Sequence, residues 1–286
     1  MMKQLAAIVV MMLVGLAHGQ SAPEGNAHPQ TQDVSDAGKS LDDPFGLPNR
    51  DQSQVASVQA KIKFAQSVDL TALRDLAVFH NGRVKIWDTL GRETVKTIVG
   101  RRQYQDFSHE TTAAGGEKVT AYSYDPLFTL LDLTIDPAYY LDKPLLGVAY
   151  LPLRAEMLDK LLPGTNEGDS LRDKLGKETA RGERERWVRL SRLTPLMVEA
   201  TLPGLANTHA GQESWRRGVG QVDQSVGLFI ECKANYLAVA PARATDPWRH
   251  ISALATESQA RGAALALGDA WRAMDAPKVH QAALTL

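Results

Sequence analysis

The sequence has little of the chemistry that marks a disulfide framework, a metal centre or an enzyme. Its 286 residues include one cysteine, Cys232, so no internal disulfide can form and the core alone must hold the fold. No two of its seven histidines lie three or four residues apart, which excludes a helical pair of metal ligands. Nucleophile-elbow, phosphate-loop and H-E-x-x-H motifs are also missing. We therefore predict that the chain is not an enzyme and holds no metal.

Charge of one sign is not in excess either. The chain has 32 Lys and Arg against 33 Asp and Glu, a net charge of −1. Such a balance produces no strong field toward a polyanion, so we expect no nucleic-acid partner.

Long apolar runs are confined to the N-terminus, where residues 5–17 carry no charge. Lys3 precedes this run and Ala17-His18-Gly19 follows it, a pattern typical of a secretory signal peptide over residues 1–19. The run is short for a membrane span, which needs about 18 apolar residues or more, but an uncleaved anchor is the alternative. Residues 20–54 are polar and predict a disordered tether. We expect a periplasmic or otherwise extracytoplasmic protein, membrane-associated if the anchor is retained.

The stretch from residue 76 to residue 100 organises the rest of the chain. Asn81-Gly82 lies between two strand-like runs and predicts a hairpin with a type I′ turn. This two-residue loop pairs His80 with Arg83 and Phe79 with Val84. Strand side chains alternate between faces, which gives an apolar face that we expect to be buried and a polar face that we expect to be exposed. The apolar face holds Ala77, Phe79, Val84 and Ile86, and the polar face holds His80, Arg83 and Lys85.

A helix is expected directly after this hairpin. Asp88 and Thr89 offer side-chain oxygens to cap its start, and Gly100 is placed to end it.

The run G-R-V-K-x-x-D-T in this stretch resembles the extracytoplasmic segment of system II c-type cytochrome biogenesis proteins. The matching residues are Gly82, Arg83, Val84, Lys85, Asp88, Thr89, Arg92 and Glu93. This chain departs from the family pattern at three positions: Ile86 stands for proline, Trp87 for leucine and Gly91 for alanine. Ile86 keeps the backbone N–H that proline lacks, so the strand can continue through it.

The remaining sequence predicts an α+β fold that is helix-rich with two β-hairpins. Residues 53–68 have an amphipathic period, residues 101–118 read as a polar loop, and Asp125-Pro126 starts a helix. Residues 206–220 are expected to form a loop, and two apolar runs, Val226–Cys232 and Tyr236–Ala240, predict the second hairpin, with Cys232 as a small buried apolar residue. A helix is expected to start at Asp246-Pro247, and a later helix has an apolar stripe of Leu267, Ala270, Trp271 and Met274. We expect five segments: the signal peptide (1–19), the disordered linker (20–54), a hairpin–helix domain (55–162), a charged mobile segment (163–192) and a C-terminal part with the second hairpin and helices (193–286).

The charged segment leaves two alternatives open, an exposed helix or loop and a docking surface for an acidic partner. Two alternatives also remain for the C-terminal end of the chain. The helix expected from Pro277 has an apolar stripe but no Gly or Asn after it, as in a truncated or split protein; the alternative is a terminal helix packed on its own core.

The resemblance implies a role in c-type cytochrome assembly, as an accessory protein that contacts a membrane component of the pathway. The chain has five isolated Trp and no tryptophan-rich loop, so we expect no cofactor of its own, with haem reaching it only through the partner. The eight expected site residues are the seven motif residues Gly82, Arg83, Lys85, Asp88, Thr89, Arg92 and Glu93, together with His80. The alternative is a secreted binding or scaffold protein unrelated to haem, in which the motif only builds a hairpin and a helix.

Overall fold

The computed structural model describes residues 55–111, 117–161, 184–232, 238–239, 246–250 and 258–286, together with Gly182 and Leu254. The expected signal peptide and tether, and most of the expected charged segment, lie outside these residues. The helices are α2 (Val58–Ser67), α3 (Thr71–Arg74), α4 (Trp87–Val99), α5 (Pro126–Ile135), α6 (Leu151–Leu161), α8 (Pro195–Leu205), α9 (Glu213–Cys232), α10 (Gln259–Arg272) and α11 (Ala276–Ala283), with a 3₁₀ turn η2 (Pro137–Tyr140). The strands are β1 (Ala77–His80), β2 (Arg83–Ile86), β3 (Gln105–Thr111), β4 (Glu117–Ser123), β5 (Leu146–Gly147), β6 (Arg192–Leu193), β7 (Ala238–Val239) and β8 (Arg249–His250).

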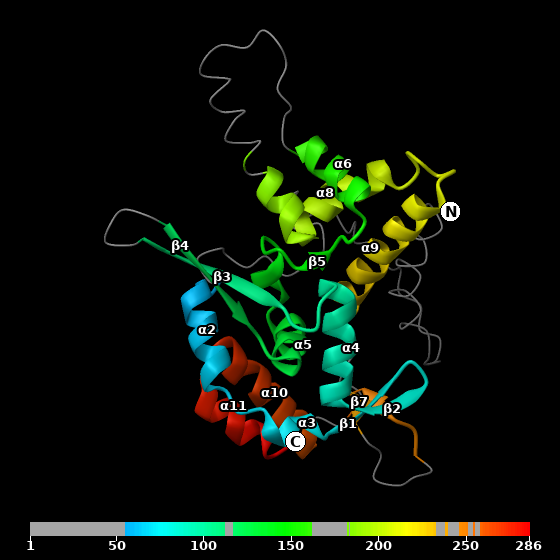
Figure 1. Cartoon of the computed structure of the whole chain (residues 1–286). Coiled ribbons are helices and arrows are strands. Elements are labelled where there is room, and N and C mark those ends of the chain that lie inside the picture. The colour runs from blue at the N-terminus through cyan, green and yellow to red at the C-terminus, as the bar shows by residue number, and fades with distance from the viewer. Residues whose placement is uncertain are drawn as a thin grey trace, which may run out of the picture. The chain divides into compact units, whose positions relative to one another are not determined.

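The α+β prediction is confirmed. Helices dominate the described residues, and their strands form four separate two-stranded antiparallel sheets: β1-β2, β3-β4, β5-β6 and β7-β8. Figure 1 shows the β3-β4 and β1-β2 hairpins reaching out from a group of packed helices.

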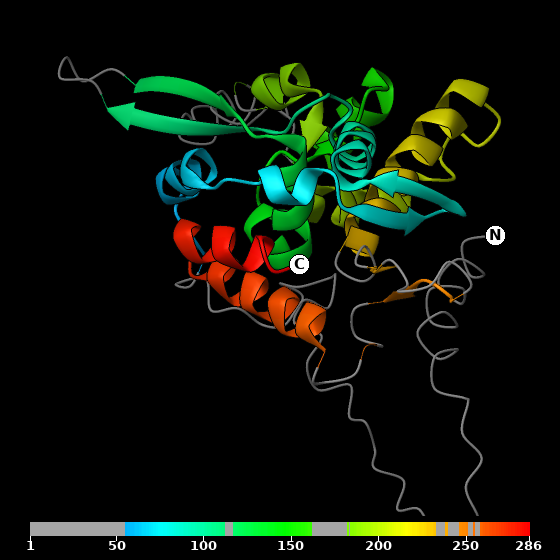
Figure 2. The ribbon, with the colours of Figure 1, turned by 90° about the horizontal axis from the view of Figure 1, so that it is seen from below.

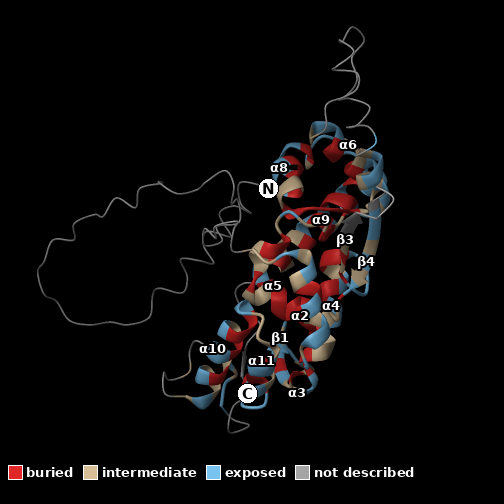
Figure 3. Cartoon of the chain, turned by 90° about the vertical axis from the view of Figure 1, so that its left-hand side faces the viewer, coloured by how far each residue is buried: buried red, intermediate tan, exposed pale blue. Residues whose placement is uncertain are grey.

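Helix α4 lies at the centre of this packing, with α5 on one side and α9 on the other (Figure 1). Its buried stripe contains Leu90, Val95 and Ile98, which recur at helical spacing and face the shared core. Figure 3 shows red, buried segments on α4, α5 and α9. Gly100 ends the helix in the left-handed conformation at φ 72°, and its N–H donates to the Lys96 carbonyl, as predicted.

Helix α5 follows the cap predicted from Asp125-Pro126. The Asp125 carboxylate accepts from the N–H of Leu127 at 2.9 Å, and Pro126 occupies the first turn. Seven of its ten residues are buried, including Thr129 and Asp132, so α5 is surrounded on nearly all sides. A helix in that position must supply partners for any polar group that it carries into the core.

The register predicted for the first hairpin is confirmed. Phe79 pairs with Val84 and His80 with Arg83, and Asn81 and Gly82 have φ values of 51° and 74°, as a type I′ turn requires.

The prediction of which hairpin face is buried is wrong. Phe79 and Val84 are 42% and 58% exposed, whereas Val78 is buried and Lys85, expected to be exposed, is half-buried. The cause lies two residues after Lys85, where the Trp87 side chain enters the core with 3% exposure. Residues two apart in a strand share a face, so the buried Trp87 turns Lys85 and its partner Val78 inward.

Residues 101–118, predicted as a polar loop, instead supply β3 and the start of β4. The prediction failed because the inward side chains of β3 are polar: Asp106 and Ser108 are each 2% exposed. A strand with polar residues on its buried face lacks the alternation of apolar and polar residues by which strands are recognised.

The predicted second hairpin is wrong for its first strand, whereas β7 lies inside the predicted second strand, residues 236–240. Residues 226–232 form the end of α9, which begins at Glu213 inside the predicted loop 206–220. The buried stripe of α9 includes the small residues Gly218 and Ser225, which interrupt the apolar period in the sequence. Cys232 is fully buried there, as predicted for a small apolar side chain. The partner of β7 is β8, in a stretch where a helix starting at Asp246-Pro247 was predicted.

The two C-terminal helices pack side by side, as the view in Figure 2 shows. Their predicted apolar stripes are confirmed: Leu267, Ala270 and Trp271 of α10 and Val279 and Ala282 of α11 are buried.

Candidate functional site

The motif residues fold into one unit made of β1, β2 and the start of α4. Asp88 was predicted to cap α4, but the residue at the N-cap position is Ile86, without a side-chain capping bond, and Asp88 lies inside the first turn. Its carboxylate accepts from Arg74 at 2.5 Å and from Arg92 at 2.7 Å. Thr89 likewise lies inside the helix. A carboxylate in the first turn interacts favourably with the helix dipole, which compensates for the missing cap.

Arg74 joins this unit to the core helix α5. Its guanidinium donates to Asp88 through Nη1 and to Asp125 through Nη2, the latter at 2.8 Å. Because Asp125 also caps α5, one arginine links α3 and the starts of α4 and α5. The hydrogen bond to Asp125, followed by that to Asp88, raises the pKa of Arg74 above its usual value.

A second ion pair joins the hairpin to the side of α4. Lys85 on β2 donates to Glu93, one turn beyond Asp88. Lys85 is half-buried, and its ammonium reaches the carboxylate of Glu93. Four of the matching motif residues, Lys85, Asp88, Arg92 and Glu93, are thus paired with one another or with Arg74.

The pairs around Asp88 should make folding stability depend on pH. Burial would raise the pKa of Asp88, but the hydrogen bonds from Arg92 and Arg74 outweigh it and hold this pKa below its usual value near 3.8. A carboxyl with a lowered folded pKa adds stability above the unfolded pKa and loses it as pH falls through the folded value. We expect Asp88→Asn to be less stable than the parent at pH 7 in urea unfolding, with the gap closing below about pH 4.

Asp246→Asn, on an exposed carboxylate, is the control and should show no such gap. A gap for Asp88→Asn that stays constant down to pH 2.5 would contradict the pairing.

The other expected site residues of the hairpin, Gly82, Arg83 and His80, differ in exposure and role. Arg83 is exposed and forms no ion pair with any described residue, and Gly82 serves the turn. His80 is half-buried, and burial together with the positive charge of Lys85 lowers its pKa. The expected polar face is therefore divided, because Lys85 binds α4 while Arg83 faces solvent.

The apolar face of the hairpin is the exposed one. Val84 is 58% exposed and Ile86 42%, and the Phe79 ring stacks on Trp248 with centroids 5.9 Å apart and planes 25° apart. We call the side chains of Phe79, Val84 and Ile86 the hairpin face. Three large apolar residues side by side on an exposed strand pair form a surface suited to another protein.

A buried polar network elsewhere was not predicted at all. The Lys61 ammonium of α2 lies 2.8 Å from Asp132 and 3.1 Å from Asp136, with Lys61 1% and Asp132 0% exposed. Asp132 also accepts from Tyr140 at 2.7 Å and from the Trp271 indole at 2.8 Å. The network joins α2, α5, η2 and α10. The sequence did contain a signal that Lys61 is buried. The helical period of residues 53–68 places Lys61 beside the apolar residues Val58 and Ile62, so Lys61 does not lie on a fully solvated face.

Asp106 of β3 forms a second buried centre beside the first. It accepts from the hydroxyls of Tyr124, at 3.2 Å, and Tyr139. Burial, followed by the charge of Asp106, raises the pKa of Tyr124 and of Tyr139, so both phenols stay protonated and act as donors. The Lys61 ammonium lies 4.7 Å from the centre of the Tyr139 ring, which brings the two centres together. Lys61, Asp132, Asp136 and Asp106 all have partners among the described residues, which is typical of a structural network.

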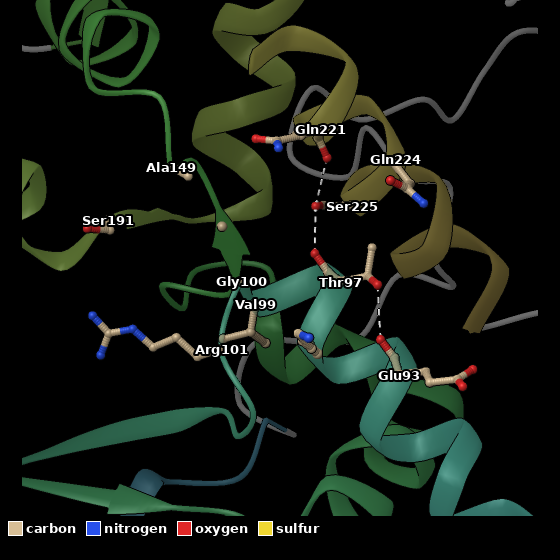
Figure 4. Close-up of a pocket in the computed structure, with 12 residues that line it drawn as sticks. Glu93, Thr97, Val99, Gly100, Arg101, Ala149, Ser191, Gln221, Gln224 and Ser225 are labelled. Carbon is tan, nitrogen blue, oxygen red and sulfur yellow. Dashed lines mark hydrogen bonds between the residues drawn. The ribbon is translucent and has the colours of Figure 1, made fainter. Parts of the chain in front are cut away.

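A cleft of about 690 Å³ lies between α4 and α9 (Figure 4). Lys96, Arg101, Gln221 and Gln224 line it with polar groups, and Gly147 of β5 forms part of its floor. Figure 4 shows Gln221 and Gln224 on α9 and Arg101 just after the end of α4. Among the described residues, no group of three or more His, Cys, Asp or Glu is placed to hold a metal ion. No helix in the described part of the chain combines the length and apolarity of a membrane span.

Comparison with known proteins returned no match: no family model fits the chain, and no curated protein or solved structure is significantly similar to it.

Proposed function

We propose that this chain is an accessory extracytoplasmic protein in c-type cytochrome assembly, which docks on a membrane haem-handling partner through the hairpin face. One observation carries the proposal: the G-R-V-K-x-x-D-T residues build a single hairpin–helix unit that is tied together internally and presents Val84 and Arg83 outward. The resemblance of this motif to system II proteins indicates the pathway, and the exposed hairpin face is the surface that would contact the partner.

The ion pairs of the unit explain why its surface suits docking. The pair of Lys85 with Glu93 holds the hairpin against α4, and Asp88 is held by Arg74 and Arg92. A surface held rigid before binding loses less conformational entropy on association than a mobile one. Exposed apolar side chains then supply the contact area, while Arg83 offers a charge to an acidic residue of the partner.

In this proposal the chain is a binding partner and not an enzyme. The haem stays with the membrane component, and the chain reaches the membrane through that component or through an uncleaved N-terminal anchor. The buried carboxylates of Asp132 and Asp106 are engaged by Lys61 and by tyrosine hydroxyls, which supports a structural use for them.

A second function, a secreted scaffold protein unrelated to haem, is favoured by the same ion pairs. They account for Lys85, Asp88, Arg92 and Glu93 through folding alone, without any partner. Arg83 and the hairpin face are not accounted for in this way, and they separate the two functions.

The test is complementation of a strain that lacks the protein. We expect that strain to have lost its haem-stained c-type cytochromes, the parent chain to restore them, and Val84→Glu to restore far less, because it places a charge on the hairpin face. Val119→Glu is the matched control, since Val119 is 52% exposed on another strand, β4.

The measurement is haem staining of membrane proteins at equal levels of the two variants. Unchanged cytochrome levels in the deletion strain would favour the scaffold function. Equal restoration by both variants would reject docking through the hairpin face.

A further inference from the structure

The cleft between α4 and α9 has rigid walls. A Cβ atom at Gly147 would lie 2.9 Å from the carbonyl carbon and oxygen of Val99, so the floor approaches α4 as closely as glycine permits. On the other side, the Ser225 hydroxyl of α9 lies 2.9 Å from the Thr97 carbonyl of α4. The dashed line in Figure 4 shows this bond crossing from one helix to the other. The opening is therefore built into the backbone and does not depend on the position of one mobile side chain.

The cations that line the cleft are not neutralised by described neighbours. Lys96 and Arg101 form no ion pair with any described residue, and the one acidic side chain of the lining, Glu93, is held by Lys85. The chain is nearly neutral as a whole, so two uncompensated cations in one cleft are a local excess. One basic residue in the last turn of α4 is expected from the helix dipole, but that interaction does not require a second at Arg101.

Two buried arginines add positive charge beside the cleft. Arg192 follows Ser191, which lines the opening, and is 1% exposed; its Nε and Nη1 atoms have no hydrogen-bond partner among the described residues. Burial and then the charge of Arg101 lower the pKa of Arg192, and the charges of Tyr104 and Asp106 raise it in part. Arg154 is also buried and donates to the carbonyls of Val148 and Ala149, of which Ala149 is part of the lining.

We propose that this cleft binds a small anionic ligand, whose carboxylate or phosphate group is held by Lys96 and Arg101. Gln221 and Gln224 of α9 also line the cleft and supply amide donors for further polar atoms of the ligand. A volume of about 690 Å³ accommodates a metabolite-sized molecule. The nearby carbonyls of α4 do not oppose the anion strongly, because those of Lys96 and Thr97 already accept from Gly100 and Ser225.

Isothermal titration calorimetry on the purified full-length chain tests this site. Pyrophosphate represents the phosphate ligands and citrate the carboxylate ligands. We expect saturable binding of at least one of them, weakened about tenfold or more by Arg101→Gln, since a hydrogen bond to a charged group is lost. Added salt should weaken the binding, because the contacts are ionic and lie in an open cleft.

Arg102→Gln is the matched control, with the same loss of charge on an exposed neighbour outside the lining. We expect it to bind like the parent. Absence of saturable binding by both probes would overturn the proposal, and so would an equal effect of the two substitutions, which indicates attraction by net charge alone. Binding by one probe only would identify which anion class the site accepts. These outcomes do not depend on the hairpin face, so the site and the proposed docking fail or succeed separately.

Discussion

Replacing Asp132 by alanine is expected to lower the free energy of unfolding by about 3–5 kcal/mol, as found when one partner of a buried ion pair is removed. The carboxylate is fully buried and accepts from Lys61, Tyr140 and Trp271. Its removal leaves three donors from three different elements in a dry core, and Asp136 alone remains to compensate the ammonium of Lys61. Urea unfolding followed by circular dichroism measures the loss.

Asp142→Ala is the matched control for that experiment. Asp142 is an exposed carboxylate that, among the described residues, pairs only with its neighbour Lys143, so its loss should change stability by less than about 0.5 kcal/mol. Combining Asp132→Ala with Lys61→Met gives a double-mutant cycle. We expect the double variant to be more stable than the sum of the single losses predicts, because it no longer contains a buried ammonium with a missing partner. Additive losses would show that the two groups do not interact.

Replacing Trp271 by alanine is expected to cost about 3–5 kcal/mol by a different mechanism, the loss of a large buried side chain. The indole is fully buried, and its ring centre lies 5.1 Å from the rings of both Phe64 and Phe128. It is the main aromatic contact of α10 with α2 and α5. Thermal and urea unfolding should both show the loss, and α10 and α11 should become more accessible to protease.

Trp271→Phe separates the ring from its N–H group. It keeps aromatic packing but removes the hydrogen bond to Asp132, so we expect a smaller loss of about 1–2 kcal/mol. Equal losses for the alanine and phenylalanine variants would contradict the packing explanation. Full stability of the alanine variant would show that the Trp271 side chain contributes nothing to the core.

Local features were predictable from the sequence because their causes are local. The Asn81-Gly82 turn determined the register of β1 with β2, and Asp125-Pro126 determined the start of α5. The face of the hairpin was not predictable, because both faces carry apolar residues and the choice depends on where Trp87 enters the core. The packing of Trp87 in the core is a tertiary contact, and no residue of the hairpin indicates this contact in the sequence.

The secondary-structure errors have a common physical origin. On α9 the small residues Gly218 and Ser225 occupy buried positions, and on β3 the polar residues Asp106 and Ser108 do. Prediction from period assumes that buried positions are large and apolar. In this chain the buried residues are small where two helices approach closely, and polar where a buried network needs acceptors. The apolar periodicity that would identify the helix or strand is therefore absent from the sequence.

The candidate site was predictable in its residues but not in its arrangement. The motif identified Lys85, Asp88, Arg92 and Glu93, yet their pairing with one another and with Arg74 depends on the approach of α3 and the hairpin to α4. The cleft between α4 and α9 could not be predicted from the sequence, for a simpler reason. Its second wall, with Gln221 and Gln224, belongs to α9, a helix that was not predicted from the sequence.

Site-specific photo-crosslinking from position 84 in intact cells tests the docking claim most directly. A benzophenone amino acid replaces Val84 on the hairpin face, and the same substitution at Val119, which is similarly exposed on β4, is the control. We predict a covalent adduct from position 84, and not from position 119, whose second component is a multi-helix membrane protein of the c-type cytochrome assembly pathway. An adduct with the same protein from both positions, or none from position 84, would contradict the proposal.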